Sequence, residues 1–124
     1  MLDKNEFKTR YVLGVIAPRN FTDMALLRSL LTPNISRVSM IVTNSVISGG
    51  ELVQMYAKEI GVPFTVYPII PQTGGALISN AQIIKQSEFV YIFSDGISKN
   101  ALNAKLECDK QGKKSKMITF APSV

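Results

Sequence analysis

The chain has 124 residues, 46% of them hydrophobic and 19% charged, which suits one globular domain with its own core. It has no histidine and one cysteine, Cys108, which excludes an internal disulfide, a Ser-His or Cys-His nucleophilic pair and histidine-ligated metals. No apolar run approaches the roughly 20 residues of a membrane span, and the charged start does not resemble a secretory signal, so we expect a cytoplasmic protein without membrane association, metal or cofactor.

A polar leader, residues 1–10, precedes a single domain, 11–124, in which apolar segments alternate with helical patterns. Short apolar strands that alternate with helices are typical of repeated βαβ units and a parallel sheet. The expected strands are Tyr11–Ala17, Val38–Thr43, Phe64–Ile69, Phe89–Phe93 and Met117–Phe120.

The first two helical patterns have recognisable ends. The first begins near Thr22, whose hydroxyl suits a cap, and stops before Pro33. The second begins at Ser48, which forms a capping box with Glu51, and Gly61 is its expected left-handed terminator. Its core side is expected to carry Leu52, Val53, Tyr56, Ala57 and Ile60.

The other two helical patterns follow the third and fourth strands. One covers Gly75–Gln86, and the next begins after Asn100, a good amino-terminal cap, and runs to Gln111. Their spacing predicts Leu102 and Leu106 as a core pair of the last helix. In the helix before it, the residues expected to face inward are Leu77, Ile78, Ala81 and Ile84.

These elements predict the α/β class: a Rossmann-like, doubly wound, three-layer αβα domain with a five-stranded parallel sheet of order 3-2-1-4-5. Such sheets bind ligands beyond the carboxyl ends of their strands, at the switch point, which here lies between the first and fourth strands. We therefore expect residues 17–20 and 94–96 to lie side by side at one crevice.

Two loops at this crevice carry charged side chains. Asp95, Ser98 and Lys99 form either a ligand loop or an ordinary Asp-Gly turn with a solvated lysine. Arg19 either binds a phosphate with its guanidinium fork or pairs with Asp23 or Asp95. The expected ligand contacts are Arg19, Asn20, Thr43, Asn44, Ser45, Asn80, Ser94, Asp95, Gly96, Ser98 and Lys99.

Three small polar residues, Thr43, Asn44 and Ser45, follow the second strand. They either hydrogen-bond a ribose or a base edge or make an ordinary turn. The chain has neither the G-x-G-x-x-G fingerprint after its first strand nor a Walker-type lysine loop, so neither common phosphate-binding motif is available.

Cleavage of a glycosidic bond calls for paired carboxylates. Asp95 is one candidate, and a partner is hard to find. Glu51 is explained by the capping box, Glu59 lies at the far end of its helix, and Asp23 suits a first turn. The catalytic residues are therefore unknown, with Asp95 the candidate if the chain is an enzyme.

Several motifs occur in order along residues 11–121: Ala17-Pro18-Arg19-Asn20-Phe21, then Tyr56-Ala57-x-x-x-Gly61-Val62-Pro63, then Ser79-Asn80, then Asp95-Gly96-Ile97-Ser98-Lys99. With these motifs the chain resembles the YspA-like group of the SLOG superfamily, whose members are Rossmann-like proteins. That group opens with Gly-Ser-Arg-x-Phe, matched here by Arg19 and Phe21. Its phosphate loop has only a late Ser-Gly-Gly counterpart in this chain, and the related phosphoribohydrolase motif Pro-Gly-Gly-x-Gly-Thr-x-x-Glu is absent.

The resemblance implies a nucleotide-binding sensor, carrier or sequestering protein, because relatives in the superfamily bind nucleotide-derived ligands or cleave nucleoside monophosphates. Arg19 would contact phosphate, Asn44 and Asn80 sugar or base, and the Asp95 loop would close the pocket. One alternative is a nucleoside monophosphate phosphoribohydrolase or a related nucleotide hydrolase. Another is a degenerate assembly or nucleic-acid-binding protein. The resemblance also implies a homo-oligomer and a phage or mobile-element origin.

The net charge of +5 favours an anionic partner. Lysines in the last twenty residues concentrate this charge around the final helix, where they either stabilise the helix end or contact nucleic acid. No aromatic residue is interleaved with them in the sequence, as a stacking surface would require. These lysines are Lys105, Lys110, Lys113, Lys114 and Lys116.

Overall fold

A computed structural model describes residues 10–122, except for the side chain of Thr73. The expected leader lies outside these residues apart from Arg10. The five strands form one parallel sheet in the order β3-β2-β1-β4-β5, so the predicted fold class and strand order are confirmed. The strands are β1 (Tyr11–Ile16), β2 (Val38–Asn44), β3 (Phe64–Tyr67), β4 (Phe89–Ser94) and β5 (Lys114–Thr119).

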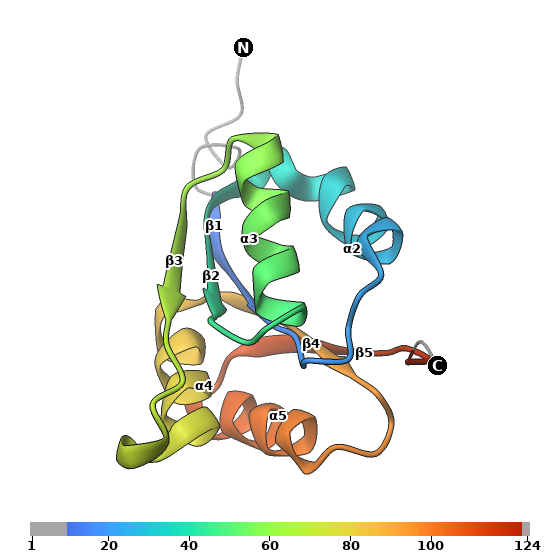
Figure 1. Cartoon of the computed structure of the whole chain (residues 1–124). Coiled ribbons are helices and arrows are strands. Elements are labelled where there is room, and N and C mark those ends of the chain that lie inside the picture. Colours follow the sequence, from blue (N-terminus) through green and yellow to red (C-terminus); the bar gives the residue numbers. More distant parts are fainter. Residues whose placement is uncertain (1–9, 123–124) are drawn as a thin grey trace.

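Helices cover both faces of this sheet. Figure 1 shows α2 and α3 on one side of the strands and α4 and α5 on the other. Short 3-10 helices extend α2 and precede α4, at Thr32–Arg37 and Pro71–Thr73. The α-helices are α2 (Met24–Leu31), α3 (Gly49–Ile60), α4 (Gly75–Gln86) and α5 (Lys99–Gln111).

The two faces of the sheet hold separate cores, because alternate side chains of a strand point to opposite faces. On β1, Leu13 and Val15 join the core under α2 and α3, whereas Ile16 joins the core under α4 and α5. On β4, Phe93 belongs to the first core, and Ile92 belongs to the second. The near-continuous apolar runs in the sequence reflect this burial on both sides.

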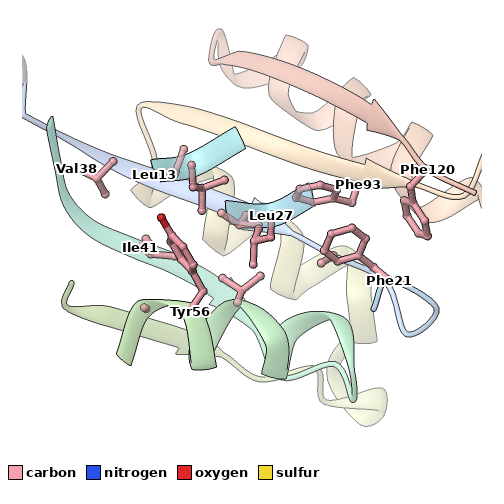
Figure 2. Close-up of a cluster of buried hydrophobic side chains, with 13 residues drawn as sticks. Leu13, Phe21, Leu27, Val38, Ile41, Tyr56, Phe93 and Phe120 are labelled. Carbon is pink, nitrogen blue, oxygen red and sulfur yellow. The ribbon is translucent and has the colours of Figure 1, made fainter. Parts of the chain in front are cut away.

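Aromatic rings close the first core at the carboxyl end of the sheet (Figure 2). Phe21 stacks on Phe93 with ring centroids 4.2 Å apart and meets Phe120 edge-on at 5.0 Å. At the other end of this core, the buried Tyr56 hydroxyl lies 2.9 Å from Thr32 Oγ1. The Phe21 ring therefore fixes the loop after β1 against the end of β4.

Some expected core positions are wrong. In α5, Leu102 and Leu106 are each 56% exposed, whereas the small residues Ala101, Ala104 and Cys108 are buried. Small side chains let α5 lie close to β4 and β5, and the larger leucines fall on the outer flank of the helix.

In α4 the expected inward face is rotated. Leu77 and Ile78 are exposed, and Ala81 is only partly buried. Ile84 is buried as expected, together with Ser79, Asn80 and Ile83. Ile60 of α3 is also exposed, at the last turn of its helix. The helix faces are therefore set by packing and by polar contacts as well as by apolar spacing.

Several ends differ from those expected. Asp23 caps α2, because its Oδ1 accepts a hydrogen bond from Leu26 N at 3.0 Å. Ser98 rather than Asn100 caps α5. β5 begins at Lys114, three residues earlier than expected, because backbone pairing to β4 continues through its lysines. Two expected features of α3 are confirmed. Its capping box is present, because Glu51 Oε1 accepts a hydrogen bond from Ser48 N, and Gly61 ends the helix in the left-handed conformation.

Along residues 10–122, no helix combines the length and the hydropathy needed to cross a bilayer.

Candidate functional site

The loops after β1 and β4 meet at the switch point of the sheet. Asn20 Nδ2 donates a hydrogen bond of 2.9 Å to Asp95 Oδ2, across 75 residues of chain. Both residues are partly buried, between the aromatic core below and the open edge above. The expected juxtaposition of residues 17–20 with residues 94–96 is therefore present.

Asp95 is held as an ionised acceptor. Its other oxygen, Oδ1, accepts the backbone N–H groups of Ile97 at 2.9 Å and Ser98 at 2.8 Å. The Asn20 amide, followed by these two backbone donors, lowers the pKa of Asp95 below its ordinary value. The side chain is thus a carboxylate at neutral pH, suited to accepting hydrogen bonds rather than to donating a proton.

The rest of the β4 loop is organised around this carboxylate. Ser94 Oγ accepts Gly96 N at 3.0 Å, and Gly96 has the left-handed φ of 87°. Ser98 Oγ accepts Asn100 N at 3.2 Å and so caps α5. The polar groups of this loop mainly hold its own backbone. Ile97 is 87% exposed, more than any other large apolar side chain among residues 10–122.

The two cations at this edge are unpaired. Within residues 10–122, Arg19 has no hydrogen bond or ion pair, so neither of its expected partners, Asp23 and Asp95, engages it. Lys99, at the start of α5, likewise has no ion pair to any described residue. Both side chains are exposed. The edge therefore combines a tethered anion with two free cations.

The residues at the end of β2 and directly after it have structural roles. Thr43 is fully buried, and its Oγ1 donates to Val15 O at 2.8 Å, which ties β2 to β1. Asn44 Oδ1 accepts Val46 N at 3.0 Å, and Ser45 Oγ accepts Ile69 N at 3.2 Å. Thr43 is thus inside the sheet rather than at the edge, and the other two shape the loops.

An unusual turn joins β2 to α3. Ser48 has φ 70° and ψ −74°, and Gly49 N donates to Ile47 O at 3.0 Å, which together make a strained γ-turn. The turn presses α3 against the loop after β1, since a Cβ on Gly49 would overlap the Pro18 carbonyl oxygen. A Cβ on Gly50 would likewise overlap the Asn44 oxygens.

This turn also uses backbone donors at the start of α3. Ser48 N binds Glu51 Oε1, and Glu51 N binds Val46 O at 3.1 Å. With Gly49 N bound to Ile47 O, few donors remain at this helix end for an incoming anion. A phosphate at the edge would therefore depend on side chains such as Arg19.

Asn80 lies at a buried polar contact between α4 and α5. It is 2% exposed, and its Nδ2 donates to Asn100 Oδ1 at 3.0 Å. Its own Oδ1 is buried and has no hydrogen-bond partner among residues 10–122. Asn100 was expected as a helix cap within the loop after β4, and its contact with Asn80 has no signal in the sequence.

A hollow of about 290 Å³ lies away from this edge, between α2 and α3. Arg28 and Glu59 form an ion pair of 2.8 Å beside it. Its lining residues are Met24, Arg28, Met55, Lys58 and Glu59, none of which was an expected ligand contact. Among the described residues, no cluster of three or more acidic, histidine or cysteine side chains is arranged to hold a metal ion.

Comparisons of this chain with family models, with curated proteins and with solved structures found no match. What the chain binds is therefore inferred from the geometry at the carboxyl-terminal edge of its sheet.

Proposed function

We propose that the chain binds a nucleotide or a nucleotide-derived molecule at the carboxyl-terminal edge of its sheet, as a sensor, carrier or sequestering protein. One observation carries this proposal. The loop after β1 holds Arg19, which has no ion pair, and the loop after β4, across the switch point, holds the tethered and ionised Asp95. Cation and carboxylate suit the two ends of a ligand that has both phosphate and sugar.

Arg19 supplies the phosphate contact. A guanidinium offers a planar fork of donors that matches two phosphate oxygens at once. Because Arg19 has no ion pair within residues 10–122, it can bind an anion without first breaking an internal contact. Lys99 adds a second, more mobile positive charge at the same edge.

Asp95 supplies the sugar contact. Its carboxylate keeps acceptor capacity beyond the hydrogen bonds it makes to Asn20, Ile97 and Ser98. Ribose hydroxyls are donors of the required kind, whereas a phosphate here would be repelled by the negative charge. This preference orients the ligand, with its sugar at Asp95 and its phosphate toward Arg19.

The buried Asn80 amide favours a polar group in the same region. An unpaired buried acceptor costs about 1–3 kcal/mol, so a hydrogen-bond donor that reaches Asn80 Oδ1 would be stabilising. Asn80 contacts Asn100, which lies two residues after Ser98. Ser98 belongs to the Asp95 loop and caps α5. A base edge, with its N–H donors, has the matching chemistry.

Binding is favoured over glycosidic cleavage. A hydrolase would need a proton donor, and the lowered pKa of Asp95 makes it a poor one. The carboxylates weighed as partners are engaged elsewhere: Glu51 with Ser48 N, Glu59 with Arg28, and Asp23 with Leu26 N. Chromatography of nucleoside monophosphates after incubation with the protein is expected to return them unchanged.

The proposal is tested by thermal unfolding with a panel of nucleotides that includes ADP-ribose and nucleoside monophosphates. A ligand at a hundredfold excess over its Kd is expected to raise Tm by about 10 °C. Arg19→Ala is expected to abolish the shift, because the phosphate loses its two-point contact with the guanidinium fork and Lys99 offers only a single, mobile charge.

Arg37→Ala is the matched control, since Arg37 is an exposed arginine at the opposite end of β2. It should leave the shift unchanged. No shift with any nucleotide, or equal losses in the two arginine variants, would contradict the proposal. Native mass spectrometry of the purified protein would identify a retained ligand and would also test the expected homo-oligomer.

A further inference from the structure

β4 is sealed on one face and open on the other. Val90 and Ile92, which point toward α5, have no exposed surface, whereas Phe89 and Tyr91, on the opposite face, are only partly buried. The difference is confined to the first part of the strand, because Phe93 is covered by Phe21. This open stretch is distinct from the carboxyl-terminal edge described above.

The strand register places lysines beside these rings. Phe89 pairs with Lys114 and Tyr91 with Lys116, so the two lysines of β5 share a face with the two aromatic residues of β4. Both lysines are exposed, whereas Ser115 and Met117 between and after them face α5. The aromatic residues that the sequence does not interleave with the lysines are therefore supplied by the neighbouring strand.

A third ring extends this surface across β1. Tyr11 packs beside the same core as Phe89 and Tyr91, and the rings of the latter two meet edge-on at 5.2 Å. Partial burial raises the pKa of Tyr11, nearby Tyr91 adds to the rise, and Arg37 opposes it. We call Tyr11, Phe89, Tyr91, Lys114 and Lys116 the Tyr91 face.

The lysines of the Tyr91 face are not held by other side chains of the described residues. Lys114 and Lys116 form no ion pair to residues 10–122. Glu88, the adjacent acid, has its Oε1 bonded to Val12 N at 3.2 Å. Two of the other lysines near the end of the chain are engaged: Lys105 pairs with Asp109, and Lys113 donates to the carbonyl oxygens of Lys85 and Ser87.

We propose that the Tyr91 face binds single-stranded nucleic acid, with bases stacked on Tyr11 and Tyr91 and with phosphates held by Lys114 and Lys116. Unpaired bases offer a flat surface to an aromatic ring, and a sheet that presents rings with flanking lysines meets both requirements of strand binding. A base-paired duplex hides its base faces and would gain only the phosphate contacts.

Charge complementarity selects this occupant over a second copy of the chain. A symmetric dimer through the Tyr91 face would bring Lys114 and Lys116 toward their own counterparts, in a chain whose net charge is already +5. An anionic strand removes this repulsion. DNA and RNA share the required chemistry, so both are used as probes.

Binding is measured by fluorescence anisotropy with labelled oligothymidylate and oligouridylate of about 12 nucleotides, and with a duplex of the same length. The expected order of affinity places either single strand above the duplex. Lys114→Gln with Lys116→Gln is expected to weaken binding and to reduce the slope of log affinity against log salt by about 1.4, the value for two lost phosphate contacts.

The matched control is Lys85→Gln with Lys110→Gln. It removes the same charge from exposed lysines of α4 and α5, on the other side of the sheet, and should leave the salt slope unchanged. Equal effects of the two double variants would mean diffuse attraction to a basic protein and would overturn the proposal. So would the absence of binding at low salt.

Tyr91→Phe and Tyr91→Leu test stacking separately from charge. Phenylalanine keeps a ring and should bind as the unchanged protein does, whereas leucine is expected to lose about tenfold in affinity. If Tyr91→Leu does not fold, the exposed lysine variants still decide the question. Sedimentation showing a dimer that Tyr91→Leu dissociates, without strand binding, would overturn the proposal in favour of a second copy.

Discussion

Ser48 has a backbone conformation that a residue with a side chain adopts only when its surroundings impose it. Two contacts impose this conformation: the packing of Gly49 against Pro18, and the hydrogen bond from Ser48 N to Glu51 Oε1. The strain is therefore located where α3 meets the loop that carries Arg19, next to the proposed ligand site.

Ser48→Gly is expected to increase the free energy of unfolding by about 1 kcal/mol, because glycine accepts a positive φ without strain and replaces a serine cap at little cost. Urea denaturation measures the change. Ser36→Gly, at an exposed position with ordinary φ, is the control and should destabilise instead. A loss of stability in Ser48→Gly would show that the turn is not strained.

The contribution of Asp95 to the free energy of unfolding depends on pH. Because its pKa is lower in the folded protein than the ordinary value of 3.8, its contribution is complete above that value and disappears as the pH falls through the folded pKa. The Tm difference between the unchanged protein and Asp95→Asn should therefore narrow as the pH is lowered from about 6 to about 2. A difference that stays constant over this range would contradict the assignment.

Among the elements, α5 departs furthest from its expected packing. Its buried stripe consists of small residues, and its large apolar residues are outside. Leu106→Gln is accordingly expected to change the free energy of unfolding by no more than about 0.5 kcal/mol. Ala104→Leu is expected to cost about 1–3 kcal/mol, because the added methyl groups would force α5 away from the sheet. Chemical denaturation of the two variants tests this, and the reverse order of costs would contradict it.

The sequence predicts the features that depend on local interactions better than those that depend on tertiary packing. The strands and their order could be predicted, because long apolar runs such as Phe89–Phe93 and turn residues such as Gly61 act locally. The approach of the Arg19 loop to the Asp95 loop follows from strand order alone. The choice of Asn20 rather than Arg19 as the partner of Asp95 depends on distances of an ångström, which no sequence pattern encodes. Similarly, α5 buries Ala104 rather than Leu106 because of how closely the helix approaches the sheet.

On the scale of the whole molecule, Cys108 reports on global opening. It is completely buried, and burial raises the pKa of its thiol. Reaction with a disulfide reagent is therefore expected to be about a hundredfold or more slower in the folded protein than in urea. Leu106→Gln should leave the rate nearly unchanged, whereas Ala104→Leu should increase it. A fast reaction in the native protein would mean that α5 detaches locally.

The pairing of β1 with β4 joins two parts of the chain, β1 to β3 with α2 and α3, and α4 to β5. The packing of α4 on β1 and β2 also connects these parts. Bringing β1 and β4 together closes a long loop of chain, which costs conformational entropy. We therefore expect this pairing to form late in folding. The hydrogen bond from Asn20 to Asp95 can form only after that closure. We therefore expect the proposed ligand site to be the last part of the molecule to assemble, so that a bound ligand would slow unfolding and leave the folding rate almost unchanged.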